Sequence, residues 1–187
     1  MLPGCVPWPK ELGLEYRRKG YWLDVSMPQM FARIADAAPG RLAVVDGDRR
    51  ISLDTLWEQS GHLAAHFHKL GLRSRQRAVF QLPNGIEFLV AFLALLRAGV
   101  IPVMALPSHR QSEIVHYVGS AEASCLLIPD RIKDFDFRQM ADAVRAERPS
   151  LQRVFVLGEA REGEISLNAL MASKADADDL AAIARIK

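Results

Sequence analysis

A run of 20 residues with a single charge constrains this chain more than any other feature of its sequence. Phe88 to Pro107 is apolar apart from Arg97, and this is about the length that a helix needs to cross a membrane. The run is interrupted, however, by Arg97-Ala-Gly99, which is typical of a helix C-terminus, and by Pro102 and Pro107. We therefore predict a buried helix, a tight turn and a buried strand instead of a membrane span.

The segments on either side of this run alternate between helix and strand signals. Helical spacing of apolar residues predicts helices over residues 26–38, 52–70, 84–98, 108–121, 136–147 and 166–171, with a further helix over 11–19. Apolar strands are predicted over residues 77–82, 100–106, 124–128 and 153–157. Gly47-Asp48 is a turn signal between residues 42–46 and 50–52, which predicts a small hairpin.

This order of elements predicts the fold class. Apolar strands separated by helices are typical of a parallel sheet that is covered on both faces. We therefore predict an α/β fold: a doubly wound, mainly parallel sheet with helices on both faces, plus the small N-terminal hairpin. Capping boxes are expected at the starts of two helices, from Asn84 with Glu87 and from Ser108 with Gln111.

Length and pattern together predict how the chain is organised. Its 187 residues suit one domain with a small additional piece. Residues 1–40 form a leader and a first helix, residues 41–171 form the α/β subdomain, and residues 172–187 form a polar tail rich in Ala and Asp. Because the tail has little apolar periodicity, we expect it to be a truncation point and not a closing element.

Charge and cysteine content exclude several classes of function. Lys and Arg exceed Asp and Glu by 24 to 22, and the first 22 residues carry that whole excess of +2. The remainder is neutral, so no basic face is indicated and we expect no nucleic-acid partner. Cys5 and Cys125 lie far apart in the sequence, which provides neither a disulfide framework nor a zinc site. Together with the lack of an apolar signal core, this usage predicts a cytoplasmic protein.

Common catalytic and nucleotide-binding motifs are absent from the sequence. No Gly-x-Gly-x-x-Gly follows a predicted strand, and there is no nucleophile elbow, Ser-x-x-Lys or His-Glu-x-x-His. Gly158 and Gly163 have the spacing of a phosphate loop, but Glu164 stands in place of its lysine and would repel phosphate. We interpret these residues as a surface turn. The segment thus offers no catalytic, cofactor-binding or metal-binding motif.

His62 and His66 lie four residues apart on one predicted helix, a spacing that can bind zinc. Their face also carries Asp54, Glu58 and Lys69, opposite the apolar stripe of the helix. A solvated face explains this pattern, with Glu58 supporting His62 one turn away. Because a zinc site needs three or four ligands, we predict no metal at this position.

Ser108-His109-Arg110 is the strongest candidate site. It directly follows the predicted strand 100–106, so it lies at the carboxyl end of that strand, where open parallel sheets bind ligands. It also opens a predicted helix, whose free N–H groups favour anions. Two interpretations stay open. One is a solvated first turn with outward cations, and the other is a site for a carboxylate, a phosphate or an acidic partner residue.

The chain resembles a known family over almost its whole length. The resemblance is sharpest at Ala105-Leu-Pro-Ser-His-Arg-Gln-Ser-Glu-Ile114 and in the leader segment Trp8–Trp22. Both segments are similar to stand-alone aryl-acid adenylating enzymes, the 2,3-dihydroxybenzoate–AMP and salicylate–AMP ligases of siderophore biosynthesis. The further matching segments are Ala43–Gly47, Ile51–Leu56, Gln81–Asn84, Phe92–Val103, Ala121–Ala123 and Ile128–Asp130.

The resemblance implies a two-step reaction in an intact parent enzyme. An aryl carboxylate would attack the α-phosphate of Mg-ATP to give an aryl-adenylate, and the acyl group would then pass to the phosphopantetheine thiol of an aryl carrier protein. The family's phosphate loop, acid pocket, nucleotide contacts and catalytic lysine have no counterpart in residues 1–187. We therefore expect no catalytic residue and no bound cofactor in this segment, which by itself should be inactive. Ser108, His109 and Arg110 are expected near the substrate or pantetheine side of the parent.

Two other interpretations belong to different classes. The chain could be a free-standing, non-catalytic α/β interaction module, or the remnant of a truncated gene. It could also be a flavodoxin-like ligand-binding domain, for which Ser108–Gln111 is the candidate phosphate-binding helix start. The sequence beyond Lys187 would discriminate between the enzyme and the module, because only the enzyme needs a phosphate loop there.

Overall fold

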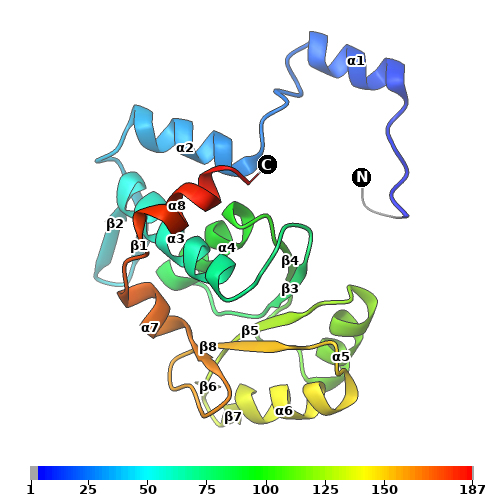
Figure 1. Ribbon diagram of the computed structural model, residues 1–187, viewed down its shortest axis with the longest axis vertical. Helices are drawn as coiled ribbons and strands as arrows, with labels where there is room; N and C mark the ends of the chain where they lie inside the picture. Colours follow the sequence, from blue (N-terminus) through cyan, green and yellow to red (C-terminus); the bar gives the residue numbers. More distant parts are fainter. Residues whose placement is uncertain (1–3, 187) are drawn as a thin grey trace.

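A parallel sheet lies at the centre of the molecule in the computed structural model, which describes residues 4–186. Within those residues the sheet has five strands in the order β4-β3-β5-β8-β9, and every neighbouring pair is parallel (Figure 1). Residues 1–3 and 187, at the ends of the predicted leader and tail, lie outside the described part. The strands are β3 (Arg77–Phe80), β4 (Ile101–Met104), β5 (Cys125–Pro129), β8 (Arg153–Leu157) and β9 (Ile165–Ser166).

Each face of the sheet has its own hydrophobic core. Along β5, Cys125 and Leu127 point into one core while Leu126 and Ile128 point into the other, as the two-residue period of a strand requires. The first core is covered by α3 (Leu53–Lys69) and α4 (Ile86–Arg97), the second by α5 (Gln111–Ser120) and α6 (Phe137–Glu147) (Figure 1). The predicted doubly wound α/β fold is thereby confirmed.

The long apolar run folds into a helix, a turn and a strand, as its interruptions predict, but the prediction of a buried strand is wrong. β4 is an edge strand whose residues are only half-buried, and Met104 is exposed, because the sheet has no further strand on that side within residues 4–186. Helix α4 ends at Arg97, Gly99 adopts a left-handed backbone with φ of 71°, and β4 begins at Ile101. Val90, Leu93 and Leu95 are buried against the sheet and α3. In the described part of the chain, no helix is long and apolar enough to cross a membrane.

The start of α4 differs from the prediction. The helix begins at Ile86 and takes no cap from the Asn84 side chain, so the expected Asn84–Glu87 capping box is wrong. The Ile86 backbone N–H instead donates to Asp46 Oδ2 at 3.3 Å, and Arg49 joins Asp46 to Glu87. Both acceptors come into reach because the hairpin of β1 (Leu42–Asp46) and β2 (Arg49–Ser52) packs beside the helix. The Ile86 N–H and then Arg49 lower the pKa of Asp46, so this carboxylate stays charged.

The leader stands away from the sheet. Helix α1 (Lys10–Arg18) projects from the body in Figure 1, and Trp8, Tyr16 and Trp22 pack on one another with ring centroids 5.4–6.0 Å apart. Helix α2 (Met27–Ala37) follows, capped by Ser26, which accepts from Gln29 N.

Helix α2 buries only part of its apolar face. Phe31 and Ala35 pack inward, but Met30 and Ile34 are exposed. The helix lies at the margin of the body, where too little protein surrounds it to cover a full stripe (Figure 1).

The C-terminal segment holds more order than its composition indicates. After α7 (Leu167–Ala172), helix α8 (Ala177–Ala184) packs along α3, and Ile183 is buried in the first core. A short hairpin of β6 (Arg131–Ile132) and β7 (Phe135–Asp136) precedes α6 and was also not predicted. Two-residue strands are too short, and an Ala-rich helix is too uniform, to show hydrophobic periodicity. Their conformation is decided by the segments that pack against them, so the sequence pattern does not predict it.

Candidate functional site

The Ser108-His109-Arg110 segment lies in a turn and not in a helix. Helix α5 begins at Gln111, and its first turn is capped by Glu113, whose Oε2 accepts from Arg110 N at 3.0 Å. The predicted capping box from Ser108 is therefore wrong. The His109 N–H donates to the Leu106 carbonyl at 3.0 Å, which closes a turn before the helix can start. Hydrogen bonds from the backbone N–H groups of Glu113 itself and of Arg110 lower the pKa of Glu113, so the cap remains ionised.

Arg110 is held in one orientation by its own turn and by the neighbouring hairpin. Its Nη1 donates to the carbonyl oxygens of Pro107 and His109, each at 2.9 Å. Its guanidinium carbon lies 4.0 Å from the ring centroid of Phe135 in β7, a cation–π arrangement. Arg110 is exposed, and it makes no ion pair within residues 4–186. It therefore presents a positive charge on a braced side chain.

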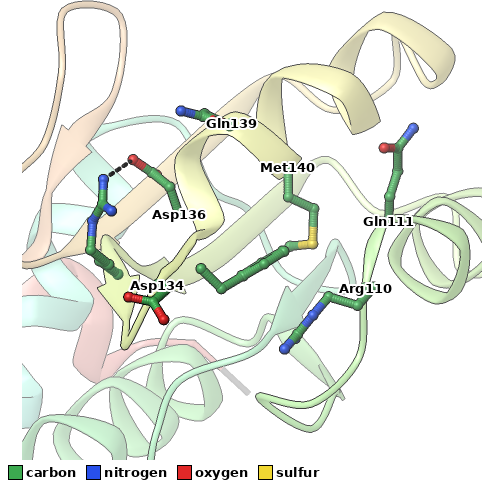
Figure 2. A pocket seen from close by; sticks show the side chains of 8 residues that line it. Arg110, Gln111, Asp134, Asp136, Gln139 and Met140 are labelled. Atoms are coloured by element: carbon green, nitrogen blue, oxygen red, sulfur yellow. Dashed lines mark hydrogen bonds and ion pairs between the residues drawn. The ribbon is translucent and has the colours of Figure 1, made fainter.

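A groove of about 510 Å³ opens beside Arg110. It runs between the start of α5, the β6–β7 hairpin and the start of α6, and Figure 2 shows Arg110 and Gln111 across from Asp134 and Asp136. Its polar and apolar side chains come from segments that the fold alone brings together. They are Arg110, Gln111, Arg131, Asp134, Phe135, Asp136, Gln139 and Met140.

Asp136 organises the far wall of this groove. Its Oδ1 caps α6 by accepting from Arg138 N at 2.9 Å, and its Oδ2 accepts from Arg138 Nη2 at 2.7 Å. The same Oδ2 accepts from Arg131 at 3.2 Å, which is the dashed line in Figure 2. Side-chain hydrogen bonds from Arg138 hold the pKa of Asp136 far below its usual range. The charge of Asp136 is thus already matched by two arginines, and it does not neutralise Arg110.

Gln81 supports the turn from below. It is fully buried at the end of β3, and its Nε2 donates to the carbonyls of Leu106 at 2.9 Å and of His109 at 3.0 Å. In the sequence, Gln81 stands out only as part of the matching segment Gln81–Asn84. The available signal was a polar amide that directly follows an apolar strand, where parallel sheets place ligand-binding residues.

The helix face that carries His62 and His66 is not solvated as predicted. The backbone N–H of Ala175 donates to His62 Nδ1 at 3.2 Å, and Ser173 Oγ lies 2.9 Å from His66 Nε2. The segment that leads into α8 crosses this face and half-buries both rings. Within residues 4–186, no group of three or more His, Cys, Asp or Glu side chains is placed to hold a metal ion.

The segment with phosphate-loop spacing is a turn that uses its own polar groups. Gly158 N donates to Asn168 Oδ1 at 2.7 Å, and Arg161 N donates to Glu164 Oε2 at 2.7 Å. Gly158 has a φ of 111°, and a Cβ there would collide with the Asp130 side chain, so only glycine fits this position. Because Asn168 and Glu164 already accept from these N–H groups, the turn does not leave a cradle for phosphate.

The parallel sheet and its two helical layers define an α/β domain, and comparison with known proteins identifies its family. The family model of the AMP-binding enzymes matches residues 31–184. The chain belongs to the AMP-binding enzyme family.

The similar proteins include two that are named as AMP ligases of aryl acids. The chain is 41% identical over 162 residues to the 2,3-dihydroxybenzoate-AMP ligase of Bacillus subtilis, which covers 87% of this chain and 30% of that enzyme. It is 40% identical over 163 residues to the salicyl-AMP ligase / salicyl-S-ArCP synthetase of Mycobacterium tuberculosis. That match covers 84% of this chain and 29% of the synthetase. The apo structure of Mycobacterium smegmatis MbtA superposes with a TM-score of 0.84 and 34% identity, over 92% of this chain and 32% of MbtA.

These comparisons confirm the resemblance to aryl-acid adenylating enzymes that the sequence predicts. The chain spans about 30% of the length of the relatives that it matches. The superposition shows that its sheet and helices correspond to part of a larger adenylating enzyme.

Proposed function

We propose that this chain is the N-terminal part of an aryl-acid–AMP ligase of siderophore biosynthesis, with 2,3-dihydroxybenzoate or salicylate as its acid. The observation that carries the proposal is the 41% and 40% identity to a 2,3-dihydroxybenzoate-AMP ligase and a salicyl-AMP ligase, each over more than four-fifths of the chain. We place the reaction in the cytoplasm, which agrees with two cysteines that are both free.

The proposed reaction has two steps. An oxygen of the aryl carboxylate attacks the α-phosphorus of ATP, the bond to the bridging oxygen breaks, and pyrophosphate leaves. The pantetheine sulfur of an aryl carrier protein then attacks the acyl carbon, and AMP leaves with the bonding electrons. Family members use Mg²⁺ with ATP, but the described residues do not fit this ion, since they offer neither a carboxylate cluster nor a phosphate cradle. We therefore assign no catalytic residue to this segment and propose that it is inactive alone.

The turn at Ser108, His109 and Arg110 is proposed to face the substrate or the pantetheine arm. It lies at the carboxyl end of β4, the edge of a parallel sheet where ligands bind. The braced guanidinium of Arg110 suits the phosphate of phosphopantetheine, because charge-assisted hydrogen bonds from arginine to phosphate are strong and directional. The groove beside it could admit the chain that carries this phosphate.

Two assays test the proposal. Aryl-acid-dependent exchange of pyrophosphate into ATP should be absent with residues 1–187 alone. It should appear in a chimeric ligase in which this chain replaces the matching segment of the Mycobacterium tuberculosis salicyl-AMP ligase. Clear exchange by the isolated chain would contradict the assignment of catalysis to other parts. A folded chimera without exchange would favour the non-catalytic interaction module.

The turn is tested in the same chimera. His109→Ala with Arg110→Ala should impair aryl transfer to the carrier protein more than it impairs folding, which the melting temperature measures. His116→Ala with Arg33→Ala is the matched control, since both residues are exposed and lie outside the turn. Equal transfer rates in the two double variants would leave the solvated turn as the better interpretation.

A further inference from the structure

We propose that Gln81 is the positioning residue of the 106–110 turn. Its side-chain amide sets the carbonyl of His109, and through that carbonyl it sets the guanidinium of Arg110. The functional consequence rests on the proposed role of this turn in aryl transfer, but the structural part does not depend on it.

The backbone and the side chain of Gln81 join different strands. Its N–H donates to the Leu127 carbonyl of β5 at 2.9 Å, so the main chain continues the sheet ladder. Its side chain reaches to the opposite side, where Nε2 bonds to the carbonyls of Leu106 and His109 beyond the end of β4. Gln81 therefore ties the loop after the edge strand β4 to the interior strands β3 and β5.

The orientation of the amide is determined by its partners. Both neighbours are carbonyl oxygens, which only accept hydrogen bonds, so the NH₂ group must face them and uses both of its protons. The Oε1 atom is buried and has no hydrogen-bond partner within the described residues. A flipped amide would place three oxygens together, so the side chain has one orientation and the two carbonyls are fixed with it.

The His109 carbonyl is the point through which Gln81 acts on Arg110. This oxygen accepts from Gln81 Nε2 at 3.0 Å and from Arg110 Nη1 at 2.9 Å. The same turn is closed by Leu106 N, which donates to His109 Nδ1 at 3.2 Å. A change at the buried residue therefore loosens the carbonyl on which the exposed guanidinium rests, although Gln81 itself touches no solvent.

Hydrogen exchange on the whole 187-residue chain tests the structural part. Gln81→Met keeps the length of the side chain and removes both donors. It should speed amide exchange at His109 by about tenfold, the effect of losing roughly one net hydrogen bond, while the β5 amides stay protected. Leu82→Met, an equally buried neighbour, is the matched control and should leave His109 unchanged. Unchanged exchange in Gln81→Met would overturn the proposal.

Gln81→Glu supplies a second, independent readout. When protonated, the new carboxyl group donates one hydrogen bond to the two carbonyls, but when ionised it faces them as a third acceptor. Protection of His109, relative to wild type at the same pH, should therefore recover as the pH falls from 8 to 5. Protection that does not depend on pH, or loss of the whole fold in both variants, would assign Gln81 to general packing and overturn the proposal.

The chimeric ligase tests the functional consequence. Gln81→Met should raise the KM for the carrier protein about tenfold, which corresponds to one hydrogen bond. The KM for the aryl acid in pyrophosphate exchange should change much less. Gln81→Met could speed amide hydrogen exchange at His109 and yet leave the KM for the carrier protein unchanged. In that case Gln81 still positions the turn, and the proposed role of the turn in aryl transfer fails instead.

Discussion

Gly61→Ala should destabilise this protein, although replacing a glycine inside a helix normally stabilises it. Gly61 lies in α3 beneath the side chain of Arg97 from the end of α4, and a Cβ there would meet Arg97 Nη2 at 2.7 Å. The guanidinium carbon lies 3.6 Å from the ring centroid of Trp57. Arg97 Nη1 donates to the Trp57 carbonyl and, at 3.1 Å, to Ser60 Oγ. Burial lowers the pKa of Arg97 to about 10, so this cation depends on its few partners.

The magnitude follows from the contacts that the new methyl group removes. The gain in helix propensity is about 1 kcal/mol. Losing the cation–π contact costs about 1 kcal/mol and losing a charge-assisted hydrogen bond about 1.5 kcal/mol, at the lower ends of their ranges because Arg97 is only half-buried. The net effect is a loss of about 1.5 kcal/mol in the free energy of unfolding.

Urea unfolding followed by tryptophan fluorescence measures this loss, and a double-mutant cycle isolates its cause. In an Arg97→Ala background the guanidinium is gone, so Gly61→Ala should stabilise the protein by up to about 1 kcal/mol. The reasoning would be refuted if Gly61→Ala stabilised the protein that retains Arg97. It would also be refuted if the substitution had the same effect in both backgrounds.

The remaining predictions concern acid stability and thiol reactivity. Hydrogen bonds from Arg138 hold the pKa of Asp136 below its unfolded value, so the stability that Asp136 contributes is fully present above about pH 4 and is lost as the pH falls further. Asp136→Asn should therefore lower the urea midpoint at pH 7, with a difference that shrinks towards pH 2, whereas Asp142→Asn on the same helix should change little at either pH. Burial raises the pKa of Cys125, so a thiol reagent should modify exposed Cys5 rapidly and Cys125 only when the protein unfolds. Rapid modification of both thiols in the folded protein would contradict this assignment.

Hydrophobic patterning predicts β3, β4, β5 and β8, because the strands of a sheet covered by helices are apolar along their length, but it does not predict the two-residue strand β9. Leu126, Leu127 and Ile128 are fully buried between two helical layers. Because both faces of this strand are buried, its apolar residues are continuous and do not alternate with polar ones. The turn at Gly99 is equally readable, since a left-handed residue after a helix favours glycine. The fold class follows from such local signals.

Helix starts could not be predicted in the same way. Asn84 and Ser108 have the residue types that cap helices, but α4 takes its cap from Asp46, and α5 starts later with Glu113 as its cap. At α4 a carboxylate that is distant in sequence replaces the local side chain, and at α5 the turn at residues 106–109 delays the start of the helix. Packing also decides the burial of His62. The segment that covers its helix face includes Ala175, more than 100 residues later in the chain, so the pattern within the helix does not reveal it.

The sequence predicts some features of the candidate site, and the tertiary structure alone decides the others. By itself, the sequence determined the family, the parallel sheet and the position of Ser108-His109-Arg110 at a strand end, because these depend on residue type, spacing and apolar periodicity. Only the tertiary structure decided what holds those residues: Phe135 against Arg110, and Gln81 beneath the carbonyl of His109. Contacts between segments tens of residues apart leave no periodic trace in a sequence, since they arise from the way in which the sheet and its helices pack.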